Sequence, residues 1–403
     1  MVDPFDLSVL ERVADPYPVL ADLRESGPVH RTTDGFWAVT GHSEALDALR
    51  HPGCASSPVA LRFLDGLPPG AARDEMVHRI NFLDPPDHPR VRGLLSTVFT
   101  PRRVAALRPW MEATAAALVD GLRARPRFDL LSDLAHQLPS LVISELLGVP
   151  VEDRERLTAF SDATAPLLGL RSTAAQRADA VAAAEEFHEY LGALLDERTA
   201  RPGDDLLSAL LAAEQPDGAD GTVRLARPEL LSLAATLYSA GHRTTRDLFT
   251  NGMSVLLDDP DRWARVVTGE WAVPEVVGEF LRYETPTLYV VRVPLVPVEI
   301  GGVEVGPWEP LVVLLGAANR DPAVYDDPDE FRPGRGGPPP LSFAFGAHYC
   351  LGASLARSEA EVLLAAVAGA FPGLQDAGTA PARRPWHQRG AFRGLDELVV
   401  APS

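Results

Sequence analysis

The sequence contains no lysine, only two cysteines and no long apolar segment. We attribute the missing lysine to the codon usage of a GC-rich genome, because arginine supplies the whole basic content. Cys54 and Cys350 are too few for a disulfide framework and indicate a reducing compartment. No run of ~20 apolar residues could span a bilayer, and residues 1–10 lack the basic and apolar regions of a signal peptide. We therefore expect a cytoplasmic protein without a membrane segment.

Positive charge is also scarce, since 37 basic residues face 56 acidic ones, giving a formal net charge of −19 and a pI near 4.9. This acidity argues against binding to nucleic acid or to an anionic membrane surface. The 403 residues are 46% hydrophobic and 23% charged, as in an ordinary globular protein. A chain of this length can bury a large core without a structural metal. We expect one large domain over residues 1–403 and a monomer.

Helical patterns dominate the sequence. Pro109 to Arg123 and Thr173 to Glu197 combine helix-forming Ala, Leu and Glu with helical spacing. The longest expected helix covers Pro228 to Asp258, where Pro228 suits the first turn and Pro260 lies beyond the end.

Strand patterns are fewer and short. They lie near residues 30–40 and 290–315, in Phe36 to Thr40, Val290 to Ile300 and Leu311 to Leu315. Asn319 to Pro340 is rich in Pro, Gly and Asp and is expected to form a long ordered loop. Pro202 to Thr222 is interpreted as a polar connector and a flexible loop. The fold class predicted is mainly α with a small β portion.

The most informative segment surrounds Cys350, directly before an amphipathic helix expected over residues 353–370. Backbone N–H groups and the helix dipole favour a thiolate at such a position. Gly346 and Gly352 remove side chains where a flat ligand could lie against the backbone, and Phe343 supplies apolar shielding. A thiolate in this setting suits a soft ligand to iron. The alternative for Cys350 is a buried structural cysteine.

The same segment resembles the heme-binding loop of the cytochrome P450 family, whose pattern is Phe-x-x-Gly-x-His/Arg-x-Cys-x-Gly. Phe343, Gly346, His348, Cys350 and Gly352 all match. The resemblance implies the cytochrome P450 fold and heme b (iron protoporphyrin IX), with Cys350 as the metal ligand. Motifs near both ends of the chain, Asp15-Pro16-Tyr17-Pro18 and Arg393-Gly394-Leu395, are typical of bacterial soluble members.

Glu279 and Arg282 stand three residues apart, on one face of a helix. On their own they could be an ordinary surface ion pair. The resemblance implies instead the family's buried Glu-x-x-Arg pair, completed by an Arg from the loop before the cysteine. Arg335 is the candidate third member, and these residues would hold the cysteine loop rather than take part in the reaction.

The resemblance also implies four residues that bind the heme carboxylates. His88 and Arg92 match a His and an Arg four residues apart in the segment that leads into a main helix of the family. Arg292 and His348 complete the set. Four donors to two carboxylates are physically coherent in an apolar pocket. Without the resemblance, Arg292 would be read as a solvated arginine on an edge strand.

The long helix contains Ala240 and Gly241, which match small residues that let the family's helix form a bulge over the iron, and Thr244, which matches its oxygen-activating threonine. Arg243 departs from the pattern, because the family normally has an acid there for proton delivery. An arginine stays charged and cannot shuttle protons. It could pair with a carboxylate such as Asp247, face a substrate carboxylate, or indicate an unusual oxidation. The neighbouring His242 and Arg246 are interpreted as solvent-side or core polar groups.

The function implied is that of a heme-thiolate monooxygenase that inserts oxygen from O2 into an apolar small molecule, in a secondary-metabolite pathway such as that of a polyketide or peptide antibiotic. Electrons would come from an external ferredoxin and an NAD(P)H reductase. Leu288, Tyr289 and Thr236 are candidates for the substrate pocket, with a plain core role as the alternative. Further candidates by family position are Ala240, Ser57 to Leu64 and Gln388 to Ala391, with the same alternative. The competing hypotheses are a peroxide-driven or non-hydroxylating oxidation (ring closure, coupling), suggested by Arg243, and a non-enzymatic heme sensor.

Overall fold

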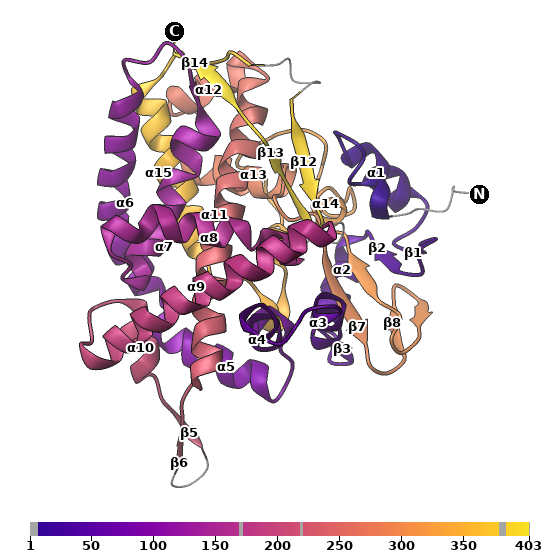
Figure 1. Cartoon of the computed structure of the whole chain (residues 1–403). Helices are drawn as coiled ribbons and strands as arrows, with labels where there is room; N and C mark the ends of the chain where they lie inside the picture. Colours follow the sequence, from indigo (N-terminus) through magenta and orange to yellow (C-terminus); the bar gives the residue numbers. More distant parts are fainter. Residues whose placement is uncertain (1–6, 169–171, 218–220, 379–383, 403) are drawn as a thin grey trace. The chain divides into compact units, whose positions relative to one another are not determined.

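The computed structural model describes residues 7–168, 172–217, 221–378 and 384–402 (Figure 1). The chain divides into two compact units. Unit 1 comprises Met1–Ala55, Arg108–Leu138 and Thr244–Ser403, and unit 2 comprises Ser56–Leu107 and Pro139–Arg243. The expected fold class, mainly α with a small β portion, is confirmed. That residues 1–403 form one domain stays a prediction.

Unit 1 holds a five-stranded sheet in the order β1-β2-β10-β7-β3. Only β2 and β10 are parallel, and the other neighbours are antiparallel. Strands occur in all three ranges where the sequence predicts them. The sheet strands are β1 (Val29–Arg31), β2 (Trp37–Val39), β3 (Cys54–Ala55), β7 (Val290–Pro294) and β10 (Leu311–Val313).

The expected strand from Val290 to Ile300 is in fact two strands. After β7, a second strand, β8 (Val298–Ile300), pairs with β9 (Val303–Val305) through the turn Gly301-Gly302. Both glycines have positive φ, +59° and +76°, which a residue with a side chain rarely adopts. The remaining strands of unit 1 are β4 (Phe128–Asp129), β11 (Gln375–Asp376), β12 (Trp386–Arg389), β13 (Phe392–Leu395) and β14 (Val399–Ala401).

The helices of unit 1 include α15, which begins at Ala353 and ends at Ala370, as the sequence predicts. It lies beside α13 (Figure 1). Arg108 of α6 donates hydrogen bonds to Ser358 and Glu361 of α15, so α6 also packs against it. The other helices are α1 (Tyr17–Glu25), α2 (His42–Arg50), α12 (Pro260–Val267), α13 (Val273–Tyr283) and α14 (Leu315–Ala318), with a π-helical turn at Leu131–Ala135.

The helix α6 (Pro101–Leu122) corrects one sequence expectation. The composition and helical spacing of Pro109 to Arg123 predict a helix that begins at Pro109. Pro109 instead lies inside the helix, which starts a little over two turns earlier at another proline, Pro101. Pro109 has no backbone N–H, so one hydrogen bond of the helix is missing there, while the flanking turns continue the helix.

Unit 2 is helical, and α9 (Ala174–Ala200) contacts three of its other helices, α4, α8 and α10 (Figure 1). Thr173 begins α9 with a reciprocal cap, since its hydroxyl accepts from Gln176 N and Gln176 Oε1 accepts from Thr173 N. The other elements are α3 (Ser57–Leu64), α4 (Ala71–His78), α5 (Asp87–Val98), α7 (Gln137–Leu147), α8 (Arg154–Ala163), α10 (Leu206–Ala212), β5 (Gln215–Asp217) and β6 (Gly221–Val223).

The interpretation of Pro202 to Thr222 as a polar, flexible connector is wrong for most of its length. Asp205 caps α10, accepting from Ser208 N at 2.7 Å, and Leu206, Leu207 and Leu210 are buried. The apolar spacing of these leucines after an N-cap aspartate was the overlooked helix signal. The strands β5 and β6 form a hairpin, and residues 218–220 lie outside the described part of the chain.

The longest helix is α11, 31 residues from Arg227 to Leu257, which confirms the expected continuous helix. It belongs to unit 2 as far as Arg243 and to unit 1 from Thr244. Its hydrogen-bond pattern is α-helical throughout, so the expected bulge at Ala240 and Gly241 is not present. Gly241 has another reason to be small: a Cβ there would lie 3.0 Å from Ile143 Cγ1 of α7, so glycine permits close helix packing.

Candidate functional site

Cys350 ends a tight loop that enters α15. Its backbone N donates to Phe343 O at 3.0 Å, and Tyr349 N donates to Gly346 O at 3.0 Å. Two short 3-10 turns, Leu341–Phe343 and Gly346–His348, form the loop, and Gly352 is the N-cap of α15. Cys350 therefore lies two residues before the N-cap of an 18-residue helix, at the end where the dipole favours an anionic sulfur.

Small residues shape the surroundings of Cys350. Gly346 has φ +76°, and a Cβ there would lie 3.0 Å from Leu49 O, so both backbone conformation and space require glycine. A Cβ on Gly352 would lie 4.0 Å from Cys350 Sγ, so its absence leaves the sulfur accessible from that side. Ala344 also adopts a positive φ of 56°, a conformation that costs free energy in a residue with a side chain.

The two cysteines differ in a way that identifies one as a ligand candidate. Cys350 is exposed, so it is not the buried structural cysteine that the sequence left as an alternative. Cys54 is half-buried in β3, and burial raises the pKa of its thiol to about 11, although Arg292 lowers it in part. Cys54 thus stays protonated at neutral pH. An exposed sulfur at a helix N-terminus, with glycine beside it, fits the heme thiolate ligand that the sequence motif predicts.

Aromatic and basic side chains surround the loop. Phe343 and Tyr349 meet edge to face, with ring centroids 6.4 Å apart. The Arg357 guanidinium lies 5.2 Å from the centre of the Phe343 ring, and that of Arg50 lies 5.9 Å from the ring of Phe345. These contacts order the aromatic residues of the loop from both α2 and α15.

The three residues predicted to hold the cysteine loop come together. Arg282 Nε and Nη2 donate to both oxygens of Glu279 at 2.8 and 2.7 Å, and Arg335 Nε lies 3.1 Å from Glu279 Oε1. Glu279 and Arg282 are almost fully buried. The backbone N of Arg332 donates to the same carboxylate at 2.8 Å. The surface-pair alternative is therefore excluded by the structure.

The two arginines also fasten the long loop that the sequence predicts, which has no helix or strand between Asn319 and Pro340. They do so through backbone carbonyl oxygens. Arg282 donates to the carbonyls of Asn319, Pro328 and Glu330, and Arg335 to those of Asp326, Asp327 and Glu330. One buried carboxylate thus organises a segment of more than 20 residues by holding two guanidinium groups in place.

A second contact closes the base of the loop. Asn319 Oδ1 accepts from Leu341 N at 2.6 Å, and its Nδ2 donates to Ser342 Oγ at 2.8 Å. Ser342 Oγ donates in turn to the carbonyl of Leu281 on α13. Leu341 is buried in the core beside the five-stranded sheet. The segment that carries Cys350 is therefore anchored to both α13 and the sheet.

The four predicted carboxylate-binding residues are divided between the units. In unit 1, Arg292 is 7% exposed on β7, and its Nη1 donates to Val291 O at 2.9 Å, while His348 is partly buried in the cysteine loop. In unit 2, His88 is buried and Arg92 partly buried, one turn apart on α5. The near-complete burial of Arg292 does not match a solvated arginine on an edge strand.

Arg243 has a different partner from the one suggested by the sequence. Its Nε lies 3.3 Å from Asp162 Oδ1 of α8, and its Nη2 donates to the carbonyl of Ser161. Asp247, the suggested partner, instead pairs with Arg246 at 2.8 Å. The i,i+4 rule named a neighbour on the same helix, but the tertiary contact with α8 determines the pair.

His242 and Arg246 are core or partly buried polar groups. His242 is 0% exposed and lies between two acceptors, Tyr238 O at 2.9 Å and Asp162 Oδ1 at 3.0 Å. Arg246 is partly buried beside Asp247. Asp162 was missed by the sequence reasoning, because nothing local links it to a helix 80 residues away.

The three pocket candidates are all buried. Leu288 and Tyr289 lie in a core cluster with Tyr17, Leu20 and Leu314, which is the core role that the sequence left as the alternative. Thr236 differs, because its Oγ1 is buried and has no hydrogen-bond partner among the described residues. Thr236 stands one helical turn before Ala240 on α11.

Another buried charged cluster in unit 2 was not expected. Glu75 of α4 is paired with Arg79 and lies 3.4 Å from His188 Nε2 of α9. Hydrogen bonding from His188 and the charges of Arg79 and Arg243 oppose the desolvation of Glu75 and hold its pKa below the ordinary value. The sequence does contain one indication of this cluster, because Glu75 and Arg79 have the i,i+4 spacing of an ion pair on a helix.

Glu359 of α15 is 1% exposed, and its Oε2 has no hydrogen-bond partner among the described residues. Burial raises the pKa of this carboxyl well above its ordinary value. The folded protein therefore keeps a proton that the unfolded chain releases above about pH 4.5, and folding stability falls as the pH rises.

We expect Glu359→Gln to remove this dependence, since an amide does not titrate. The measured quantity is the unfolding free energy of the variant minus that of the unchanged protein. Above pH 5 this difference should increase by up to about 1.4 kcal/mol per pH unit. Urea unfolding at pH 5.5 and pH 7.5 measures it. Equal differences at the two pH values would contradict the burial argument.

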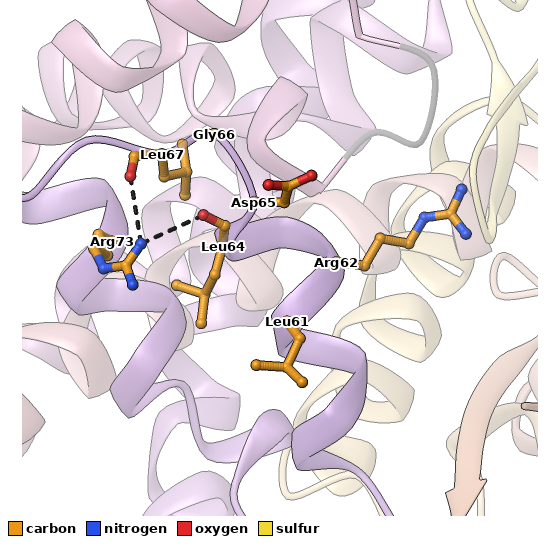
Figure 2. A pocket seen from close by; sticks show the side chains of 7 residues that line it. All are labelled: Leu61, Arg62, Leu64, Asp65, Gly66, Leu67 and Arg73. Atoms are coloured by element: carbon orange, nitrogen blue, oxygen red, sulfur yellow. Dashed lines mark hydrogen bonds between the residues drawn. The ribbon is translucent and has the colours of Figure 1, made fainter. Parts of the chain in front are cut away.

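A hollow of about 610 Å³ lies at the turn between α3 and α4 (Figure 2). Arg73 crosses it and donates to the carbonyls of Leu64 and Leu67 at 3.4 Å each. Arg177, which lies on α9, donates hydrogen bonds to the carbonyls of Phe63 and Asp65. The guanidinium groups thus terminate α3. Three residues of the lining, Leu61, Arg62 and Leu64, belong to the segment Ser57 to Leu64 that the sequence offers as a candidate for the substrate pocket.

No described helix of the chain is both long and apolar enough to cross a lipid bilayer.

Comparisons with known proteins agree with these features. The family model described as Cytochrome P450 matches residues 273–378. Cytochrome P450 monooxygenase PikC of Streptomyces venezuelae is 36% identical, over 96% of this chain and 91% of that protein. Nocardicin C N-oxygenase of Nocardia uniformis subsp. tsuyamanensis is 37% identical, over 96% and 95%. The crystal structure of CalO2 superposes with a TM-score of 0.92 at 30% identity, covering 100% of this chain and 99% of that one.

Proposed function

The chain belongs to the cytochrome P450 family and is a cytochrome P450 monooxygenase, and from this premise we propose that it inserts oxygen from O2 into an apolar small molecule during the tailoring of a secondary metabolite. The observation that carries the proposal is the exposed Cys350 before α15, in a loop anchored by Glu279. A relative named as an oxygenase of nocardicin C supports the substrate class.

Cys350 would hold the heme iron through its thiolate. When bound, the heme supplies the oxygen-activating chemistry, and a thiolate ligand favours O–O cleavage. The N-terminal turn of α15 stabilises the negative sulfur, and Gly352 leaves it accessible. Gly346 would keep side chains away from the heme ring, and Phe343 would shield the site from water.

The heme carboxylates would be held by His88, Arg92, Arg292 and His348. Each can donate hydrogen bonds, and Arg292 and His88 are buried, where charge-assisted hydrogen bonds are strongest. The predicted structural set, Glu279 with its two arginines, does not touch the ring in this proposal.

The hydroxyl oxygen of Thr244 on α11 would hold and orient the proton that the reaction needs. Of the two small residues on the preceding turn, Gly241 packs against Ile143, which leaves Ala240 as the residue that would give space beside the threonine. The substrate would lie beside α11, where the Thr236 hydroxyl, which has no hydrogen-bond partner among the described residues, can bind one of its polar atoms. Leu288 and Tyr289 stay candidates for the substrate pocket.

The family uses redox partners, and we propose an external ferredoxin with an NAD(P)H reductase as the electron source. A monomer that binds neither nucleic acid nor a membrane surface is consistent with the net charge of −19. The single-domain organisation of residues 1–403 is part of the same proposal.

The peroxide-driven or non-hydroxylating alternative rested on Arg243. Its pairing with Asp162 and Ser161 engages the guanidinium within unit 2, which supports an ordinary positioning role over the binding of a substrate carboxylate. Turnover with ferredoxin, reductase and NAD(P)H should therefore exceed turnover with hydrogen peroxide. The reverse order of rates would favour the alternative.

The experiment that tests the proposal is the difference spectrum of the reduced protein with and without carbon monoxide. A thiolate-type red shift of the Soret band is expected, followed by a shift of the iron spin state when apolar substrates are added. Folded, heme-containing protein without that band would overturn thiolate ligation. The band without any substrate-induced spin shift or product would favour a heme sensor.

A further inference from the structure

Two buried polar groups of unit 2 have no hydrogen-bond partner among the described residues. They are the Nε of Arg79, directly after α4, and the hydroxyl oxygen of Thr236 on α11. Arg79 is 6% exposed and Thr236 is 7% exposed, and neither of these two atoms reaches bulk water. Buried polar groups are nearly always hydrogen-bonded, because an unpaired one costs free energy. Two such groups in one unit therefore indicate a ligand that supplies an acceptor.

The two groups lie near the contact between α4 and α11. The Ser232 hydroxyl donates to the carbonyl oxygen of Glu75 at 2.9 Å, which joins the two helices. Arg79 follows Glu75 by four residues, and Thr236 follows Ser232 by four residues. Each is therefore about one helical turn from this contact, on the side of its helix that carries it.

The charge of Arg79 is already balanced within the cluster. Its Nη1 donates to Glu75 Oε1, and Glu75 Oε2 lies 3.4 Å from His188 Nε2. Burial opposes the ionisation of Glu75, but the hydrogen bond from His188 and the charge of Arg79 outweigh it and hold the pKa of Glu75 below its ordinary value. Glu75 is thus a carboxylate at neutral pH. The N–H that remains on Arg79 suits a neutral acceptor, since a second anion would be buried beside Glu75 without a counter-charge.

The helices leave some room beside this cluster. A hollow of about 130 Å³ is lined by His188 and by the immediate neighbours of Glu75 and Ser232 in the chain, Asp74 and Leu231. Pockets that hold a whole drug-sized molecule measure about 300–1,000 Å³. We therefore expect only the oxygen-bearing end of a ligand to reach this part of unit 2.

We propose that Arg79 and Thr236 bind a neutral carbonyl oxygen of the substrate and so select an apolar molecule that carries one. The Arg79 Nε–H and the Thr236 hydroxyl both donate, and a carbonyl oxygen has two lone pairs to accept them. A carboxylate would add an unbalanced charge beside Glu75, and a hydrocarbon would leave both donors unpaired. The inference rests on the proposed monooxygenase function, whose substrate class it narrows.

The test compares three probes of similar chain length: methyl decanoate with a neutral carbonyl, decanoate with a charge, and decane with neither. Dissociation constants are measured on the full-length, heme-loaded protein by calorimetry and by the shift of the iron spin state. Methyl decanoate should bind about 10- to 100-fold more tightly than decane, the range expected for hydrogen bonds from a charged donor. It should also bind more tightly than decanoate.

Variants that remove one donor each should abolish this preference. Arg79→Lys keeps a positive charge beside Glu75 but loses the Nε–H, and Thr236→Val loses the hydroxyl at nearly constant volume. Each should weaken methyl decanoate about 10-fold and leave decane unchanged, whereas Thr236→Ser should keep the preference. Ser232→Ala is the matched control, because its hydroxyl already has a backbone partner one turn away. It should leave the ratio of the two affinities unchanged.

The charge argument has its own test in Glu75→Gln. This change leaves the Arg79 guanidinium without its counter-charge, so decanoate should now bind more tightly than methyl decanoate. An unchanged order of the two affinities in Glu75→Gln would overturn the assignment of a neutral ligand.

Infrared spectra of methyl decanoate labelled at its carbonyl carbon observe the hydrogen bonds directly, without turnover. The carbonyl band should lie at lower frequency in the unchanged protein than in Thr236→Val. If Thr236→Val or Arg79→Lys does not fold, the band of the unchanged protein is compared with that of the ester dissolved in decane, and equal frequencies overturn the inference.

The carbon monoxide spectrum separates the two proposals. A missing thiolate band in the unchanged protein overturns the proposed function. A normal band together with equal affinities for methyl decanoate and decane, or with no binding of either, overturns only the inference.

Discussion

Replacing Cys350 with serine is expected to abolish the thiolate-type Soret band and to reduce oxygenase turnover below detection. Serine keeps the size and the backbone hydrogen bond to Phe343 O, so the loop should remain folded. Its hydroxyl does not ionise near neutral pH and cannot replace a thiolate as a strong electron donor to iron. The measurement is the reduced carbon monoxide spectrum, with heme content and turnover determined on the same sample.

The matched control is Cys54→Ser, because Cys54 is the other thiol of the chain. Its pKa of about 11 keeps it protonated, and it lies on the edge strand β3 rather than at a helix N-terminus. The control should retain both the band and the turnover. A Cys350→Ser variant that kept them would show that this sulfur does not hold the heme.

The second large effect concerns stability. Glu279→Gln is expected to lower the free energy of unfolding by about 3–5 kcal/mol, because two buried guanidinium groups lose their counter-charge. Glutamine keeps the volume of the side chain, so the loss reports on charge rather than on a cavity. Since folded proteins are stable by only about 5–15 kcal/mol, the variant should also lose heme and unfold at much lower denaturant.

Denaturant unfolding followed by circular dichroism measures this change, and heme absorbance on the same samples shows whether the cysteine loop loosens first. Glu275→Gln is the control, since Glu275 is exposed on the same helix α13 and should change stability by less than about 0.5 kcal/mol. A loss below about 1 kcal/mol for Glu279→Gln would mean that the backbone carbonyls alone hold the two arginines.

These two sites were also the parts that sequence reasoning predicted best. The bounds of α11 and α15 follow from apolar periodicity with proline or glycine at the ends, which are local signals. Cys350 is recognisable because the other residues of its motif, Phe343, Gly346, His348 and Gly352, lie within a few positions of it. Arg335 could be named because a motif linked it to Glu279, although the two are 56 residues apart.

Other features could not be predicted, because their determinants are not local. Asp162 reaches α11 only through the packing of α8, and no pattern in the sequence connects the two positions. The leucines of α10 were misread for a different reason, since the polar composition around them was outweighed by their burial. The close contact of Gly241 with Ile143 likewise depends on how two helices approach each other.

The anchoring of the long loop between Asn319 and Pro340 has a consequence for how this enzyme can vary. Arg282 and Arg335 recognise main-chain oxygens, which every amino acid supplies in the same place. The exposed side chains of Asp326 and Glu330 can therefore be exchanged widely without disturbing the path of the chain. Asp327 is more restricted, because its φ is +47° and it pairs with Arg332. Mutational tolerance should be high at the exposed positions of the loop and low at Asn319, Glu279 and the two arginines, a contrast that leaves the outer surface open to adaptation while the cysteine stays in place.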